Sequence, residues 1–378
     1  MRSLDIWLLP YLRQQARNKL KRSVTGGPQH IIFCFVDHFE PVSVGSTIDD
    51  ERRRMRAWTT GYPLLSRRHW DSDGVMPQHS WFYPGEAYRA EHLDSLSELC
   101  RQGLGEIELH LHHGYDTSAS LRARIEESLQ NFNKHGALIT RGKPALKTYG
   151  FIHGNMALDN SMGDPRWCGV NNELDILQET GCYADFSMPT APAKSQTHKI
   201  NAIYYAVDNP QAPKSHNTGK DVEVGHRHRD GLMIVQGPLS LSWSHRKWGL
   251  LPHIDNGEIM GHRPATPNRI MRWVGLHIHV QARPEWVIVK VSTHGAEERH
   301  FPALLGDAAD HLYTFLETHF RSGDDYRLHY VTARELFNII KAAESGRVGD
   351  PGQYRDFLIP PYLNRPASVA QHESYHAR

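Results

Sequence analysis

The densest group of residues that could do chemistry is an imidazole-rich stretch near residue 110. His110 and His112 stand at the end of a run, 106–112, in which polar and apolar side chains alternate. Side chains two positions apart on a strand share a face, so both imidazoles could bind one metal ion, and zinc readily takes His nitrogen. His113 begins the following loop and could turn in as a further ligand. The alternative is that these imidazoles pair with buried carboxylates such as Glu108.

A second group stands where a buried strand is expected to end. The apolar run 31–36 is followed by Asp37-His38-Phe39-Glu40. An acid, an imidazole and a second acid at a strand end are more polar groups than a core needs. Asp37 could bind the metal or accept a proton from metal-activated water, unless it only caps the next turn. His38 or Glu40 could complete the ligand set, and Glu40 could also contact a substrate.

Three weaker groups also follow strand-like runs. His294 comes directly after the β-branched run 286–293 and could be the general acid that protonates a leaving amine or alkoxide. His153 and Asn155 share a face at another strand end, and Asp185 lies in the next strand candidate. His153, Asn155 and Asp185 fit substrate-contact or supporting roles, and a simple turn explains them about equally well.

Strand-like runs alternate with helix-like runs along most of the chain. The expected strands are 31–36, 80–83, 106–112, 149–153, 182–187, 286–293 and 327–331. The expected helices are 91–102, 121–132, 172–180, 308–320 and one that begins after a capping box at Thr332 and Glu335. Such alternation indicates parallel βαβ units, in a barrel or an open sheet. In a β/α barrel the active site lies at the carboxyl ends of the strands, where all five polar groups are expected.

The expected organisation is one large α/β domain with short flanking segments. Residues 1–27 contain an amphipathic helix, residues 28–346 form the β/α domain, and residues 347–378 form a C-terminal tail that is loosely held after Pro360. Residues from about 194 to 272 break the alternation with short strand-like runs and many turn residues. They predict a β-rich insertion over the mouth of the barrel.

The composition is that of an ordinary globular protein. Its 43 Lys and Arg nearly balance its 42 Asp and Glu, which gives no reason to expect nucleic-acid binding. The four cysteines form no CxxC pair, and no apolar stretch is long enough to span a membrane. We therefore expect a cytoplasmic protein. Residues 1–22, apolar and then basic, could lie on the inner membrane surface or pack on the outside of the barrel.

The order of these motifs resembles the polysaccharide deacetylase superfamily, specifically a divergent bacterial branch of deacetylase-like proteins. The segments that carry the resemblance are Phe35–Pro41, Glu106–His113, Phe151–Asn155 and Val289–Gly295. The resemblance implies an irregular (β/α)7-type barrel and a divalent metal, with zinc as the first choice. It also implies hydrolysis of acetyl groups on a polysaccharide or glycan precursor.

The first family motif is matched in part, and the residue that ends the last family motif is matched. In the family the first strand ends in two adjacent aspartates, a base and then a metal ligand. Asp37 matches the base, and His38 stands in the place of the ligand. The late family strand ends in a His that assists the leaving group, and His294 matches it.

The second family motif is altered in this chain. The family has two His residues four positions apart. His110 matches the first, but Gly114 occupies the second position, so His112 or His113 would have to substitute. The resemblance therefore leaves the full metal ligand set open.

Two other functions fit the same residues. A glycosidase would use paired carboxylates and no metal. The candidate carboxylates are Asp37, Glu40, Glu86, Asp116 and Asp185. A non-catalytic glycan-binding or assembly protein would keep the fold and bind sugar without turnover.

Overall fold

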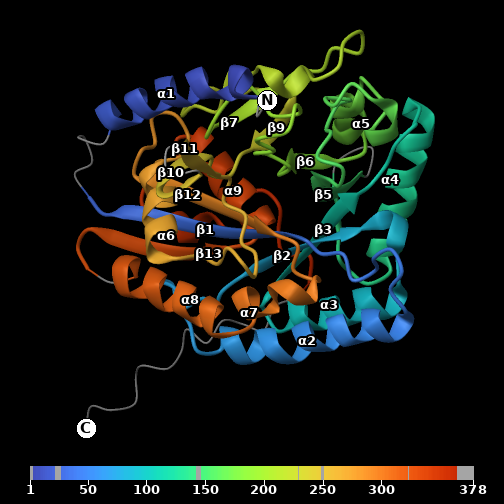
Figure 1. Ribbon diagram of the computed structural model, residues 1–378, viewed down its shortest axis with the longest axis horizontal. Coiled ribbons are helices and arrows are strands. Elements are labelled where there is room, and N and C mark those ends of the chain that lie inside the picture. Colours follow the sequence, from blue (N-terminus) through green and yellow to red (C-terminus); the bar gives the residue numbers. More distant parts are fainter. Residues whose placement is uncertain are drawn as a thin grey trace.

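The structure is a computed structural model that describes residues 3–21, 27–141, 146–228, 230–247, 251–321 and 323–363 (Figure 1). Its helices are α1 (Leu4–Lys21), α2 (Ile48–Ser66), α3 (Ala90–Arg101), α4 (Ser118–Asn133), α5 (Glu173–Glu179), α6 (Pro267–Gly275), α7 (Phe301–Leu304), α8 (Asp307–Phe320) and α9 (Ala333–Glu344). Its strands are β1 (Gln29–His38), β2 (His79–Pro84), β3 (Gly105–Leu111), β4 (Ile139–Arg141), β5 (Leu146–His153), β6 (Cys182–Asp185), β7 (Ile203–Ala206), β8 (Lys220–Asp221), β9 (Leu232–Val235), β10 (Ser240–Lys247), β11 (Leu251–Asp255), β12 (Trp286–Thr293) and β13 (Tyr326–Val331).

A mostly parallel sheet centred on β1 forms the core of the fold. The strand order is β12-β1-β2-β3-β5-β6-β9-β7-β8, with β13 also beside β1 and β4 beside β5. The amino-terminal part of β1 pairs with β13, and its last residues pair with β2. Pairing is parallel from β12 through β9, so the carboxyl ends of these strands meet along one edge. The expected α/β class is confirmed.

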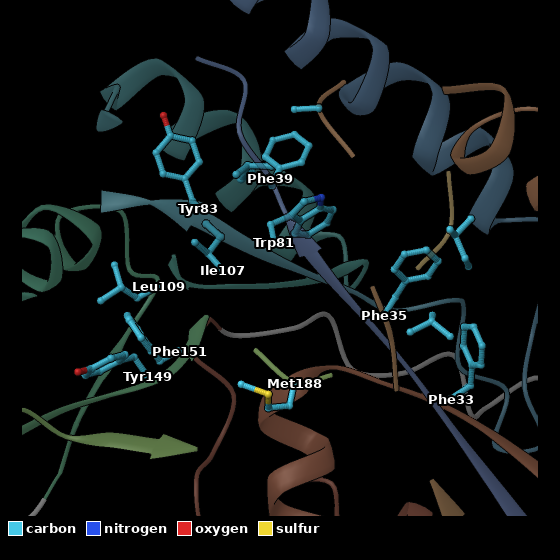
Figure 2. Close-up of a cluster of buried hydrophobic side chains, with 14 of the residues drawn as sticks. Phe33, Phe35, Phe39, Trp81, Tyr83, Ile107, Leu109, Tyr149, Phe151 and Met188 are labelled. Carbon is cyan, nitrogen blue, oxygen red and sulfur yellow. The ribbon is translucent and has the colours of Figure 1, made fainter. Parts of the chain in front are cut away.

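Side chains of the strands alternate between two hydrophobic clusters, one on each face of the sheet. The first cluster contains Phe33 and Phe35 of β1, Trp81 and Tyr83 of β2, Ile107 and Leu109 of β3, and Tyr149 and Phe151 of β5 (Figure 2). These side chains pack against apolar residues of α2, α3, α4 and α8. As predicted for residues 106–112, the apolar positions of β3 face the helices, and the polar positions point the other way.

The second cluster lies on the opposite face and is built around α9. Ile32, Cys34 and Val36 of β1 pack there with Leu336 and Ile340 of α9. Almost all of α9 is buried, because strands and the C-terminal segment cover it. The buried guanidinium of Arg334 donates a hydrogen bond of 2.8 Å to Glu106 of β3. This ion pair ties α9 to the polar face of the strand that carries His110.

The segment predicted as an insertion, residues 194–272, contributes to the main sheet. Its strand β9 pairs in parallel with β6, and β7 and β8 extend the sheet by antiparallel pairing. Strands β10 and β11 form a separate hairpin. Among the described strands, no ladder joins β8 to β12, so closure into a complete barrel is not observed. Isolated bridges from Ile278 to Ile288 of β12, and from Gln281 to Glu223, connect the two ends through one short segment.

The N-terminal segment forms a helix that packs on the domain. Trp7 of α1 is fully buried and Tyr11 nearly so, whereas Leu9 and Leu12 are exposed. No described helix combines the length and the apolar character needed to cross a membrane. All four cysteines are buried, and none forms a disulfide. The rest of the predicted N-terminal segment, 22–26, and of the predicted tail, 364–378, lies outside the described residues.

Candidate metal centre

Residues from β1 and β3 meet at the carboxyl edge of the sheet. His38 is the last residue of β1, Glu40 follows two positions later, and His110 is the penultimate residue of β3. One ligand atom from each of these three side chains lies within 4.8 Å of the other two. His110 Nε2 lies 3.1 Å from Glu40 Oε1, and the ring centroids of His38 and His110 are 4.9 Å apart. The sequence therefore delivers two imidazoles and one carboxylate to one point.

The electrostatics of this group suit a cation. Burial, followed by the charges of His294 and His110, holds the pKa of His38 well below its usual value, so its imidazole is neutral. Burial alone would raise the pKa of Glu40, but the hydrogen bond and charge of His110 lower it to about 2. Nδ1 of His38 and Nδ1 of His110 are buried and have no hydrogen-bond partner among the residues that the structure describes. Neutral imidazole and ionised carboxylate are the forms that bind a metal ion.

Two imidazole–carboxylate pairs flank the centre. His112 Nδ1 lies 2.6 Å from Glu86 Oε1, while its Nε2 lies 3.8 Å from Glu40. Burial is the largest single effect and lowers the pKa of His112, but the hydrogen bond to Glu86 and the charges of Glu40 and Glu86 together outweigh burial and raise it. On the other side, His294 Nδ1 lies 3.3 Å from Glu258 Oε1. Burial is again the largest single effect and lowers the pKa of His294, but the hydrogen bond to Glu258 and the charges of the nearby carboxylates together raise it.

The segment that carries Glu258 is fixed by a buried ion-pair network. Asp255 ends β11 and accepts hydrogen bonds of 2.9 Å from both Arg263 and Arg269. Beyond it, Glu258 forms a parallel bridge with Ser292 near the end of β12. This pairing places the Glu258 carboxylate beside His294, whose ring stacks on that of His38 at a centroid distance of 4.7 Å.

A pocket of about 420 Å³ opens onto the centre. Its lining includes His38, Glu40, Arg54, His294, Glu298 and Arg299. Two of the candidate ligands, His38 and Glu40, therefore share one solvent-connected space with the predicted proton donor, His294. A ligand in this pocket could reach both His38 and His294.

Asp37 lies next to the centre but faces away from its ligand atoms. The carboxylate is fully buried and accepts a hydrogen bond of 2.6 Å from the backbone N–H of Gly295. Its other oxygen lies 2.8 Å from His79 Nε2. A Cβ added at Gly295 would lie 2.0 Å from Asp37 Oδ2, so this close approach requires glycine. Asp37 is not in the three-residue group, and its contacts join the ends of β1, β2 and β12.

The remaining predicted site residues make their contacts outside the group of His38, Glu40 and His110. His113, predicted as a ligand beside His110, points instead toward His153, and the two ring centroids are 4.5 Å apart. Asn155 donates a hydrogen bond of 2.7 Å to the His113 carbonyl and so holds the loop. Asp185 is buried and accepts a hydrogen bond of 2.7 Å from the Ser187 hydroxyl. Of the four predicted substrate contacts, only Glu40 lines the 420 Å³ pocket.

Sequence reasoning missed Glu258 as a partner of His294. It stands in an irregular stretch after β11, about 36 residues before His294, and no local pattern marks it. Sequence reasoning also missed Cys168 and Glu173, which join His113 and His153 in a second group of ligand-type side chains. A lone cysteine and an acid in a first helical turn have ordinary explanations, so neither carries a signal by itself.

The group of His38, Glu40 and His110 fits a divalent cation by its donor chemistry. Two His and one carboxylate are an established ligand set of hydrolytic zinc sites, which leave a further position open for water. Comparison with known proteins adds no assignment, since no protein-family model and no curated protein matches the chain.

Proposed function

We propose that the protein is a metal-dependent hydrolase that removes acetyl groups from a polysaccharide or glycan precursor. The observation that carries this proposal is the meeting of His38, Glu40 and His110 in one group, of which His38 and Glu40 line the 420 Å³ pocket. The donor set favours zinc, because two imidazoles and one carboxylate with an open position are typical of hydrolytic zinc.

The residues around the centre provide positioning and proton transfer. A cation held by the three ligands would polarise the acyl oxygen and make bound water a stronger acid. His112, backed by Glu86, is placed to accept a proton, and His294, backed by Glu258, is placed to give one to the leaving nitrogen or oxygen. Asp37 then acts as a positioning residue, since its hydrogen bonds hold the chain on either side of the centre.

Our choice of an acetylated glycan as the substrate rests on the resemblance of the four sequence motifs to those of polysaccharide deacetylases. The same resemblance leads us to infer an irregular (β/α)7-type barrel. The bridges from Ile278 to Ile288 and from Gln281 to Glu223 support this architecture, because they link the two ends of the sheet. Exposed Leu9 and Leu12 on α1 support peripheral contact with a membrane where such precursors are assembled.

The glycosidase alternative has less support from the carboxylates. Asp37, Asp116 and Asp185 are each hydrogen-bonded to other protein groups. Glu40 and Glu86 remain at the centre, but His112 lies between them, 3.8 Å from one and 2.6 Å from the other. A glycosidase needs two carboxyl groups facing one glycosidic bond.

Acetate release tests the proposal directly. The full chain is stripped with a chelator and assayed on N-acetylated and O-acetylated oligosaccharides before and after zinc is added. We expect acetate only after zinc is added. His110→Ala should lower the rate more than about 100-fold, because loss of a ligand weakens metal binding more than loss of a supporting group does. The exposed His226 offers a matched control, and His226→Ala should keep the wild-type rate.

Each rival has its own outcome in this assay. Reducing ends released without zinc would indicate a glycosidase. Oligosaccharide binding without any product, in zinc-loaded protein, would indicate a binding or assembly protein. Either result would overturn the proposed deacetylase activity.

A further inference from the structure

A second group of ligand-type side chains lies beside the candidate metal centre and is fully enclosed. His113, His153, Cys168 and Glu173 each offer one ligand atom, and these atoms all lie within 4.8 Å of one another. His113 is 4% exposed, and the other three residues have no exposed surface. The four residues come from the loop after β3, the end of β5, the loop before α5 and the first turn of α5.

Glu173 is the hub of this group. Its Oε1 lies 3.1 Å from His113 Nε2. Its Oε2 lies 3.8 Å from His153 Nε2 and accepts a hydrogen bond of 3.4 Å from the Cys168 thiol. The backbone N–H of Asp159 also donates to Oε2, at 2.6 Å. The carboxylate therefore gathers the two imidazoles and the sulfur around a common point.

His153 points to a missing ligand. The side chain is completely buried, yet neither of its ring nitrogens has a hydrogen-bond partner within the described parts of the chain. A buried imidazole without partners is unfavourable, since it gives up its hydrogen bonds to water and gains none. A metal ion bound to one ring nitrogen would remove this penalty.

His113 shows the second feature of a metal-bound imidazole. While Nε2 faces Glu173, Nδ1 lies 3.2 Å from Asp116 Oδ2. A carboxylate behind the imidazole is the usual arrangement for a His ligand, because it orients the ring and makes the ligating nitrogen more basic. An ion pair of His113 with Glu173 would explain the placement of His113 alone, and would not explain why both ring nitrogens of His153 are buried in the same group.

We propose that His113, His153, Cys168 and Glu173 bind a structural Zn²⁺ that is separate from the candidate metal centre at His38, Glu40 and His110. Four protein ligands complete a tetrahedral site and leave no position for water, which is the pattern of structural zinc. This inference is independent of the proposed function.

The ion would stabilise a long irregular stretch. Between β5 and α5, the described chain has one short 3-10 turn at Pro165–Trp167 as its only regular element. Met156, Asp159 and Asn160 have positive φ values of 50°, 53° and 52°, a conformation that few non-glycine residues adopt. A metal bound at both ends of this stretch would hold it in place beside the active-site edge.

Cobalt substitution separates this site from the first one. The full chain is stripped with a chelator, checked for folding by circular dichroism, and titrated with Co²⁺. We expect a sulfur-to-cobalt charge-transfer band in the near ultraviolet, since only a thiolate ligand produces it. Cys168→Ser should lose the band. Cys182→Ser is the matched control and should keep the band, because Cys182 is also buried but, among the described residues, its thiol bonds only to the Ala184 carbonyl.

Two further variants make the test independent of folding defects in one protein. His110→Ala should keep the charge-transfer band, because His110 is a candidate ligand of the other centre. His153→Gln keeps the thiol and should weaken cobalt binding by more than about tenfold. A folded wild-type protein that binds cobalt without the band would overturn the proposal. A band that persists in Cys168→Ser would overturn it as well.

Discussion

At the scale of single residues, Asp37 and His113 show how partners far away in the chain orient a polar side chain. Asp37 stands where polysaccharide deacetylases, which the sequence motifs resemble, have a catalytic base, yet its carboxylate is occupied by the Gly295 N–H and His79. His113 adjoins the candidate ligands in sequence but turns toward His153. Hydrogen-bond partners far apart in the chain decide these orientations. Residue types and spacing alone could therefore predict an imidazole-rich centre, but not its ligand set.

Glu258 provides a prediction at this scale. In Glu258→Gln, the amide can still hold the ring of His294, but the negative charge that favours the protonated imidazole is lost. We expect kcat for acetyl release to fall about 10–100-fold, with KM little changed, because the proton is given in the reaction and not in binding. Steady-state kinetics on the zinc-loaded enzyme measure both constants.

The chain offers a matched control for this variant. Glu223 and His226 form a similar imidazole–carboxylate pair on the surface, with 3.4 Å between Oε2 and Nδ1. Glu223→Gln should behave as wild type. If Glu258→Gln did so too, Glu258 would have no part in the reaction.

At the scale of elements, local sequence patterns predicted where the strands lie, but not which segments lie beside each other in the fold. Alternation in residues 106–112 correctly separated Leu109, which faces the helices, from His110, which faces the opposite side. Helix α2 was missed, although Met55, Trp58, Tyr62 and Leu65 form its buried stripe, because Gly61 and Pro63 interrupt the pattern. Strand order depends on contacts between distant segments. The approach of Glu258 to β12 is such a contact, and no local signal reveals it.

At the scale of the whole molecule, the two edges of the sheet have different roles. The carboxyl edge carries the candidate metal centre and the pocket. The amino edge carries a buried pair of imidazoles, in which His30 Nδ1 lies 2.8 Å from His329 Nε2. Burial, and then the charge of His329, lower the pKa of His30 to about 4. The stability of the fold is therefore linked to pH at an edge remote from the pocket.

The direction of this pH effect follows from proton binding. Between pH 6.5, the ordinary pKa of His, and about 4, the unfolded chain binds a proton at His30 that the folded chain does not. The free energy of unfolding should fall as pH decreases through this window, and the contribution of His30 is at most about 3 kcal/mol. His30→Gln should reduce the slope, as measured by urea unfolding at several pH values. His226→Gln, at an exposed site, should keep the wild-type slope, and an unchanged slope in His30→Gln would contradict the assignment.

The most direct test of the central claim is to locate the bound metal. Crystals of the zinc-loaded chain, measured at the zinc absorption edge, should show an anomalous peak in contact with His38, Glu40 and His110. The account would be contradicted if the loaded protein showed no peak at that position and His110 still paired with Glu40. A peak at Cys168 alone would support only the structural site and would leave the hydrolase without its metal.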